Sequence, residues 1–184
     1  MIKARDSRAL IESLTRIEVS VGDAILVPAG TPHAIDEGIF VLELQEPTDL
    51  SILLEWDGFA VDGDKDGHLN LGYELALDAL RLTPLTDSER QEVVTRFEEA
   101  SSKSQVIFNA IANSFFRADF LAGDDLEVEA GFGIFLCLTG EGHLVFNKTE
   151  KLSVKAGDAV VIPHSAGGFK LNGCKGIISR PPAA

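Results

Sequence analysis

The chain has 184 residues, of which 45% are hydrophobic and 24% charged, a composition that excludes a disordered or collagen-like protein. Its 16 basic and 29 acidic residues give a net charge of −13, which opposes binding to nucleic acid or to anionic membranes. The sequence shows neither a long apolar run nor a secretory signal, which argues against a transmembrane helix and secretion. The two cysteines, Cys137 and Cys174, lack the spacing of a metal or redox motif, so we expect a cytoplasmic protein with free thiols.

Three helices are predicted from capping residues and helical periodicity. Asp6 or Ser7 can cap a helix over residues 8–16, because a short polar side chain accepts hydrogen bonds from the first free N–H groups. A second helix begins near Tyr73, and a third begins near residues 87–88.

Short runs rich in β-branched and aromatic residues predict strands along most of the remaining chain. Gly140-Glu141-Gly142 and Asn172-Gly173 are turn signals between some of them. The predicted strands span residues 39–44, 50–55, 126–129, 132–138, 143–147, 150–154, 158–162 and 176–179. The sequence therefore predicts a mainly β chain with a few helices, folded as a barrel or jelly roll.

One piece of the sequence occurs twice. Residues 19–30 read VSVGDAILVPAG, and residues 154–166 read VKAGDAVVIPHSA. Each copy has a Gly-Asp pair suited to a tight turn, then an apolar run suited to a buried strand. A proline follows and ends the strand, because it has no N–H for the ladder. The repetition predicts two related β-units.

The first copy extends into the motif GDAILVPAGTPH, which ends at His33. This spacing resembles the second conserved motif of the cupin superfamily, in which the histidine is a metal ligand. The usual asparagine four residues later is replaced by Glu37. A lone histidine is more often structural, but its place at the end of this motif favours the metal-ligand interpretation.

The surrounding sequence resembles type I mannose-6-phosphate isomerases of the cupin superfamily. The segments that carry the resemblance are PAGTPHAI, LELQEPTD, FFRADFL, GDAVVIP and the terminal RPP. The resemblance covers nearly the whole chain and corresponds to the C-terminal half of that family. It implies that residues 1–60 form the C-terminal part of a metal-binding cupin and that residues 61–112 form a helical or loop connection. Residues 113–184 would form a complete, metal-free cupin-like jelly roll.

The resemblance also implies a zinc cofactor, for which this chain offers one ligand, His33. The family's Gln-x-His pair and a glutamate precede that histidine, but the 32 residues before His33 contain no Gln and no other His. In the second copy the aligned residue is Gly168, which fits a unit without metal. We expect His143 and His164 to be structural or surface residues, since they lack partners at metal-ligand spacing.

Glu43 is the candidate catalytic residue. Strand alternation would place Val41, Glu43 and Gln45 on one face, where a carboxylate is costly unless it is paired or functional. If that face is solvated, Glu43 is a plain surface charge. The resemblance implies an active-site glutamate at Glu43 and an arginine ten residues later, where this chain has Leu53.

Two residues of the following loop, Lys65 and His68, are weaker candidates for holding a substrate phosphate. We expect them to be solvated loop residues, because this loop is rich in acidic residues and glycine.

The implied function is the zinc-assisted interconversion of mannose 6-phosphate and fructose 6-phosphate through an enediol. One imidazole does not hold zinc tightly, so we expect this chain either to be an incomplete fragment of the enzyme or to work with a second copy or a complementing N-terminal polypeptide. The alternative is a non-catalytic sugar-phosphate-binding or scaffold cupin module, which Leu53 and the absent ligands favour. An unrelated cupin such as a metal oxygenase would need two or three histidines in one barrel, and the four His in this sequence are too dispersed.

Overall fold

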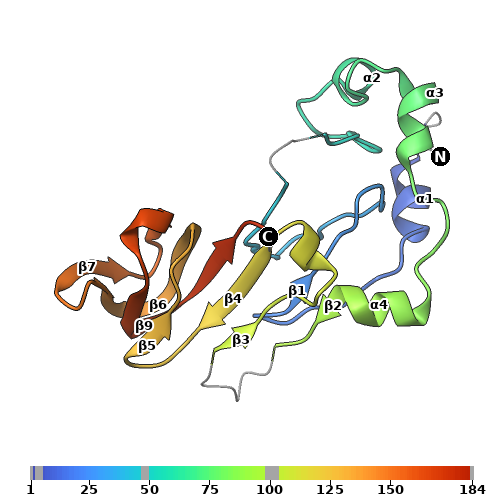
Figure 1. The fold of residues 1–184 in the computed structure, drawn as a ribbon. Helices are drawn as coiled ribbons and strands as arrows, with labels where there is room; N and C mark the ends of the chain where they lie inside the picture. The colour runs from blue at the N-terminus through green and yellow to red at the C-terminus, as the bar shows by residue number, and fades with distance from the viewer. Residues whose placement is uncertain (1, 3–5, 47–49, 98–103, 183–184) are drawn as a thin grey trace. The chain divides into compact units, whose positions relative to one another are not determined.

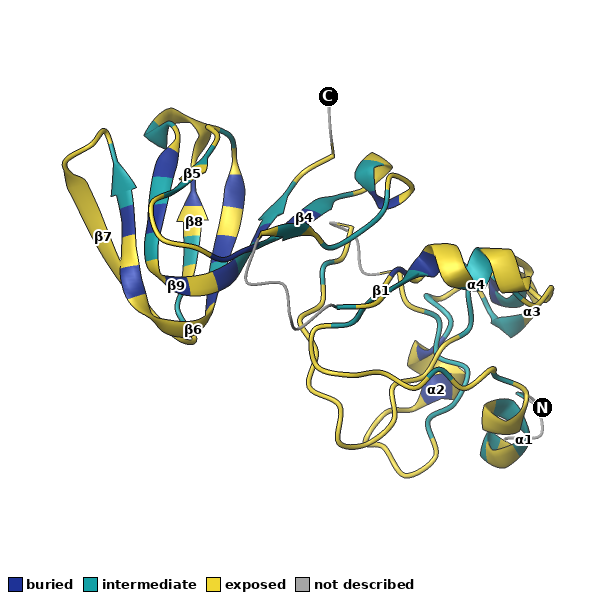
Figure 2. Cartoon of the chain, turned by 90° about the horizontal axis from the view of Figure 1, so that it is seen from below, coloured by how far each residue is buried: buried dark blue, intermediate teal, exposed yellow. Residues whose placement is uncertain are grey.

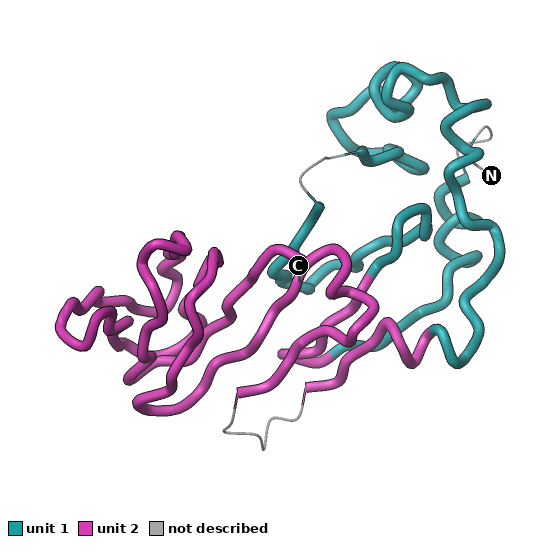
Figure 3. Tube along the Cα trace, viewed as in Figure 1, with its two compact units in different colours: residues 1–19, 27–89 teal, residues 20–26, 90–184 magenta. Residues whose placement is uncertain are grey.

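A computed structural model describes residues 2, 6–46, 50–97 and 104–182. It contains two compact units: unit 1 comprises residues 1–19 and 27–89, and unit 2 comprises residues 20–26 and 90–184 (Figure 3). None of the helices in the described ranges has the length and apolar character needed to cross a membrane. The division at residues 60 and 112 suggested by the family resemblance stays a prediction.

The helices and strands follow one another along the chain as drawn in Figure 1. They are α1 (Ser7–Glu12), β1 (Ala24–Ile25), α2 (Gly63–Asp66), α3 (Tyr73–Ala76), the 3-10 turn η2 (Leu77–Ala79), α4 (Asp87–Val93), β2 (Val94–Thr95), β3 (Gln105–Val106), η3 (Ala112–Ser114), β4 (Arg117–Leu121), β5 (Leu126–Val128), β6 (Gly133–Phe146), β7 (Glu150–Lys155), β8 (Ala159–Ile162), η4 (His164–Ala166) and β9 (Phe169–Arg180).

Unit 2 is built around two long antiparallel strands, β6 and β9. The first half of β6 pairs with β8, and the second half of β9 pairs with β4, which β3 extends. The other halves of β6 and β9 pair with β7 and β5 respectively. Each long strand therefore serves two sets of neighbours, as in a jelly roll. The predicted mainly β fold with a cupin-like jelly roll is confirmed.

Glycines bend the two long strands where the sequence suggested turns. The register between β6 and β9 shifts on both sides of Gly140, whose φ is +84°, and Gly173 lies nearby with φ +79°. Glycine accepts this left-handed conformation without a steric penalty, so it suits a β-bulge. The turns predicted at these positions are wrong, because the bulges bend continuous strands instead of ending them.

The hydrophobic core of unit 2 is formed by residues of β4, β6, β7, β8 and β9, and buried residues are dark blue in Figure 2. Its fully enclosed side chains come from β6, β8 and β9: Phe135, Cys137, Leu144, Ile162, Leu171 and Ile178. Cys137 and Cys174 are buried free thiols, as predicted. Burial, together with a hydrogen bond to Cys137, raises the pKa of the Cys174 thiol to about 12.

Unit 1 contains short helices whose caps explain their positions. The Asp6 side chain accepts the Ala9 N–H at 3.0 Å and begins α1, which confirms the predicted cap. The Ser13 hydroxyl donates to the Leu10 carbonyl oxygen at 2.6 Å, and α1 ends at Glu12, earlier than predicted.

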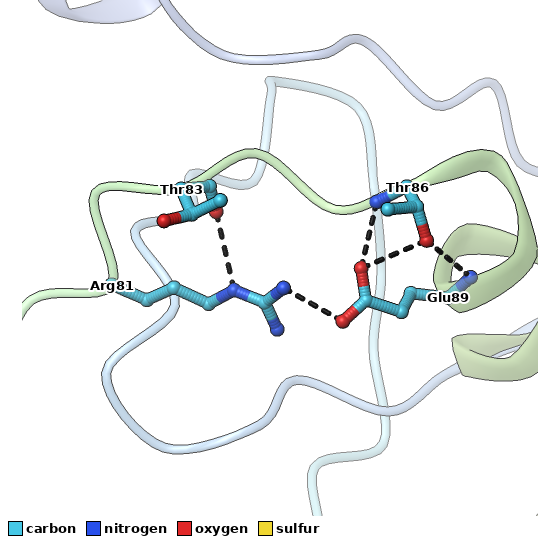
Figure 4. Close-up of polar contacts among 4 residues, drawn as sticks. All are labelled: Arg81, Thr83, Thr86 and Glu89. Atoms are coloured by element: carbon cyan, nitrogen blue, oxygen red, sulfur yellow. Dashed lines mark hydrogen bonds and ion pairs between the residues drawn. The ribbon is translucent and has the colours of Figure 1, made fainter.

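A capping box begins α4 close to the predicted position (Figure 4). The Thr86 N–H donates to Glu89 Oε2 at 2.8 Å, and the Glu89 N–H donates to Thr86 Oγ1 at 3.2 Å. Arg81 Nη2 donates to Glu89 Oε1 at 2.7 Å. The Arg81 hydrogen bond, followed by the bonds from Thr86, lowers the pKa of the exposed Glu89 carboxyl to about 2.

Candidate functional site

The Gly-Asp turn has the same hydrogen bonds in both copies of the repeat. The Ser20 N–H donates to Asp23 Oδ2 at 2.9 Å, and the Lys155 N–H donates to Asp158 Oδ2 at 2.9 Å. The return bonds run from the Asp23 N–H to the Ser20 carbonyl oxygen and from the Asp158 N–H to the Lys155 carbonyl oxygen. The glycine before each aspartate has a φ of +93° or +94°. The predicted relation between the two copies is confirmed at this turn.

The proline that follows each strand begins a second matching turn. The Thr31 N–H donates to the Pro28 carbonyl oxygen at 3.1 Å, and the Ala166 N–H donates to the Pro163 carbonyl oxygen at 3.0 Å. His33 thus comes two residues after a turn whose form recurs in unit 2. The strands between the turns differ, since β8 has four residues whereas β1 has two.

Asp23 anchors the first turn more strongly than Asp158 anchors the second. Its carboxylate also accepts the Phe97 N–H at 3.0 Å and an Arg96 N–H at 2.6 Å, and its side chain is 4% exposed. Hydrogen bonds from the backbone of Phe97 and Ser20, and then from Arg96, lower the pKa of the Asp23 carboxyl against the opposing effect of burial.

His33 is exposed, and its Nδ1 atom lies 2.9 Å from the Thr31 carbonyl oxygen. A carbonyl oxygen only accepts, so Nδ1 carries the proton of the neutral ring and Nε2 offers its lone pair. Metal-binding histidines are commonly oriented by such a bond from the second ring nitrogen to a backbone oxygen. The local geometry therefore suits His33 to the metal-ligand role, which stays a prediction.

The second copy has no room for a side chain at the aligned position, Gly168. A Cβ atom at this residue would lie 2.9 Å from the Val128 carbonyl oxygen, closer than real Cβ contacts. A side chain there would require the backbone to move. The expectation that the jelly roll of unit 2 binds no metal stays a prediction.

Glu43 lies in a segment without regular secondary structure, and its side chain is exposed. The strands predicted at residues 39–44 and 50–55 are wrong for the described residues, because none of them is hydrogen-bonded into a ladder. The expected common face of Val41, Glu43 and Gln45 is therefore not formed. No hydrogen bond or ion pair joins His33 to Glu43 among the described residues. The catalytic role of Glu43 stays a prediction.

Leu53, which stands at the arginine position of the family, is half-buried and fixed through its backbone. Its N–H donates to the Gly67 carbonyl oxygen at 2.8 Å, and its carbonyl oxygen accepts the Tyr73 hydroxyl at 2.8 Å. Burial, followed by the charge of Asp64, raises the pKa of Tyr73. This position supplies no cation for a phosphate.

His68 holds its own loop together. Its Nδ1 accepts the Gly72 N–H at 3.1 Å, so Nε2 carries the proton and donates to the Asp64 carbonyl oxygen at 2.9 Å. Both ring nitrogens are occupied, which matches the expectation of a loop residue. Lys65 is exposed in α2 (Gly63–Asp66), so the predicted loop is helical at this residue.

The residues that the structure describes do not by themselves form a zinc site. No three His, Cys, Asp or Glu side chains within the described ranges come together as a metal-binding group. Catalytic zinc is ordinarily held by three protein ligands, and only His33 has the motif and orientation of one. Any zinc bound through His33 would need ligands from outside these residues.

A cavity of about 330 Å³ in unit 1 was not indicated by the sequence motifs. It lies against α1 and residues 54–62, and its walls include Leu10, Leu54 and Trp56. Glu55, a further wall residue, accepts the Ser7 hydroxyl at 2.9 Å. His33 and Glu43 do not line this cavity, and its carboxylates oppose a phosphate.

Curated proteins with similar sequences are mannose-6-phosphate isomerases. The chain is 25% identical over 164 residues to mannose-6-phosphate isomerase ManA of Bacillus subtilis, which covers 88% of this chain and 50% of that protein. It is 24% identical over 166 residues to mannose-6-phosphate isomerase of Streptococcus mutans, with coverages of 90% and 50%. The chain spans about half the length of the curated relatives it matches. The predicted family resemblance is confirmed.

Among solved structures, the chain is similar to mannose 6-phosphate isomerase from Salmonella typhimurium bound to fructose 6-phosphate and zinc. The identity is 13%, the TM-score is 0.46, and the match covers 60% of this chain and 27% of that one. A cupin-2 domain protein from Shewanella frigidimarina matches with 18% identity and a TM-score of 0.35, covering 46% of this chain and 84% of that one. No protein-family profile matches the chain.

Proposed function

We propose that this chain supplies part of the active site of a sugar-phosphate isomerase of the mannose-6-phosphate isomerase type. The main support is the sequence similarity to isomerases along about nine-tenths of the chain. The structure adds one local observation. After the duplicated turn, His33 of the first copy directs Nδ1 to the Thr31 carbonyl oxygen and has no partner at Nε2 among the described residues, whereas a side chain at Gly168 of the second copy would meet the backbone. A cytoplasmic location is part of the proposal and accords with the two free thiols.

The proposed reaction interconverts mannose 6-phosphate and fructose 6-phosphate. A base removes the proton from C2 of the aldose and returns it to C1 of the enediol, while the hydroxyl proton moves from O2 to O1. Glu43 is the proposed proton carrier, because its carboxylate lies in an otherwise apolar stretch and is open to a ligand. We assign His33 to hold the metal, zinc, together with ligands from the half of the relatives that this chain does not span.

One specific observation favours a second candidate function. Leu53 occupies the family's arginine position, and both of its backbone groups are bonded to the adjacent loop. A chain without that cation would bind a phosphate more weakly, since guanidinium groups donate charge-assisted hydrogen bonds to phosphate oxygens. The second candidate is accordingly a non-catalytic module that binds sugar phosphates or serves as a scaffold.

A coupled isomerase assay distinguishes the two candidates. The chain is mixed with a polypeptide that carries the remaining half of Bacillus subtilis ManA, and mannose 6-phosphate turnover is measured with added zinc. We expect turnover in the mixture, with a loss of about 100-fold or more in the Glu43→Gln variant. The Glu46→Gln variant removes a neighbouring exposed carboxylate and serves as the control. Binding of mannose 6-phosphate without turnover in any mixture would select the non-catalytic module.

A further inference from the structure

Two arginines of unit 2 face each other across a pair of strands. Strand β9 runs beside β4 (Figure 1), and its register places Arg180 directly opposite Arg117. Leu121 of β4 and Ile178 of β9 belong to the hydrophobic core. Alternate residues share one face of a strand, so both arginines lie on the core side of the sheet, where β4 begins and β9 ends. Like charges directly opposite each other destabilise a strand pair, which suggests that a counter-ion belongs here.

No carboxylate neutralises this arginine pair at close range. Within the described ranges, neither Arg117 nor Arg180 makes an ion pair, and both residues are half-buried. Burial, followed by repulsion from Arg117, lowers the pKa of Arg180. A partly buried charge is costly unless it is paired, so an anion against the two guanidinium groups would relieve both the burial and the repulsion.

Backbone oxygens hold the two guanidinium groups in place and leave donors open. Arg180 donates from Nη2 to the Glu129 carbonyl oxygen at 2.8 Å and from Nη1 to the Phe132 carbonyl oxygen at 3.3 Å. Arg117 donates from Nε to the Pro181 carbonyl oxygen at 3.0 Å. Both Nη groups of Arg117 keep their N–H donors without a partner in the described part of the chain. The pair is therefore oriented by the fold and still able to bind a ligand.

Two carboxylates in the neighbourhood oppose an anion from a greater distance. Asp119 lies on the same face of β4 as Arg117, and burial raises its pKa despite the charges of Arg180 and Arg117. Glu129 contacts Arg180 through its backbone, and its side chain is exposed. We therefore expect modest affinity, and removal of the Asp119 charge should increase it.

The number of open donors favours a phosphate group over a carboxylate. One guanidinium fork is enough to occupy both oxygens of a carboxylate. A phosphate group has three terminal oxygens and so can accept a bidentate pair of bonds from one arginine and a further bond from the other.

We propose that Arg117 and Arg180 bind a phosphate group, either inorganic phosphate or the phosphate of a monoester, at this end of the β4–β9 pair. The site lies wholly within unit 2. His33 and Glu43 take no part in it, so this inference does not rest on the proposed function.

Titration of the isotope-labelled full chain with inorganic phosphate, followed by amide NMR at constant ionic strength, tests the site. We expect saturable shifts centred on residues 117–119, 129–132 and 178–180. Arg117→Gln should weaken phosphate binding at least about tenfold. Lys175→Gln removes the same charge from an exposed position of β9 and should change the affinity less than about twofold. Asp119→Asn should strengthen binding, a gain that a folding defect cannot imitate.

Mannose 6-phosphate and mannose distinguish the two sources of the phosphate group. Shifts with mannose 6-phosphate but not with mannose identify a monoester as a ligand, whereas shifts with inorganic phosphate alone restrict the site to the free ion. Either result supports the site. The inference is overturned if neither phosphate compound produces saturable shifts, if acetate binds as tightly as phosphate, or if Arg117→Gln weakens binding no more than Lys175→Gln.

Discussion

Removal of the Asp23 carboxylate should destabilise the chain more than removal of its repeat counterpart, Asp158. Asp23 is 4% exposed and accepts hydrogen bonds from Ser20, Phe97 and Arg96. In the Asp23→Ala variant the half-buried Phe97 N–H loses its partner, which costs about 1–3 kcal/mol. Loss of the ion pair with the exposed Arg96 adds about 0–1 kcal/mol to this cost. Among the described residues, the Asp158 side chain accepts a hydrogen bond only from the exposed Lys155 N–H, so Asp158→Ala should cost about 1 kcal/mol or less.

Urea denaturation followed by far-UV circular dichroism measures this difference. A loss of about 2 kcal/mol shifts the midpoint by about 1 M for a domain of ordinary size. The pH dependence gives a second check. The pKa of Asp23 is lowered on folding, so its stabilisation is present above the ordinary aspartate pKa of 3.8 and is lost as the pH falls through the folded pKa. Equal midpoint shifts for the Asp23 and Asp158 variants would refute the reasoning.

Three further perturbations test the packing and the electrostatics. Leu144→Ala removes a fully buried core side chain and should lower the free energy of unfolding by about 2–5 kcal/mol, measured by thermal unfolding. Leu138→Ala, on the exposed face of β6, should lower it by less than about 1 kcal/mol. Similar losses for the two variants would contradict the assigned core. Glu89→Gln should lower the melting temperature above pH 4.5. Because folding lowers the pKa of Glu89, the difference in melting temperature between the variant and the unchanged chain should vanish as the pH falls toward about 2. A constant difference across this range would be inconsistent with the capping box. Gly168→Ala should destabilise the β5–β9 pairing by about 1–3 kcal/mol, since the Cβ atom of the alanine meets the Val128 carbonyl oxygen. Faster exchange of the β5 amides would measure this destabilisation. Unchanged exchange would contradict the close approach.

Local sequence signals predicted the C-terminal strands well. Residues 150–154 lie in β7, and β8 covers residues 159–162 of the strand expected at 158–162. The strands expected at 132–138 and 143–147 are one strand, β6, because a glycine in a strand produces a bulge as readily as a turn. Whether the glycine forms a bulge or a turn depends on pairing with the strand β9, and the local sequence does not specify that pairing.

The N-terminal strands could not be predicted in the same way. Residues 39–44 have strand-forming side chains, but a strand also needs a hydrogen-bonded neighbour, and the described chain offers them none. The sequence repeat did identify the turn that precedes His33, since Gly-Asp and proline fix the backbone locally. The orientation of the imidazole by the Thr31 carbonyl oxygen came from the structure alone.

Elemental analysis of zinc tests most directly whether His33 belongs to a shared metal site. The purified chain is measured alone, mixed with the remaining half of Bacillus subtilis ManA, and mixed as the His33→Ala and His143→Ala variants. We expect about one zinc per mixed complex and little zinc in the chain alone. The His33→Ala variant should lose the zinc, and the His143→Ala variant should retain it. Stoichiometric zinc that survives His33→Ala would contradict it.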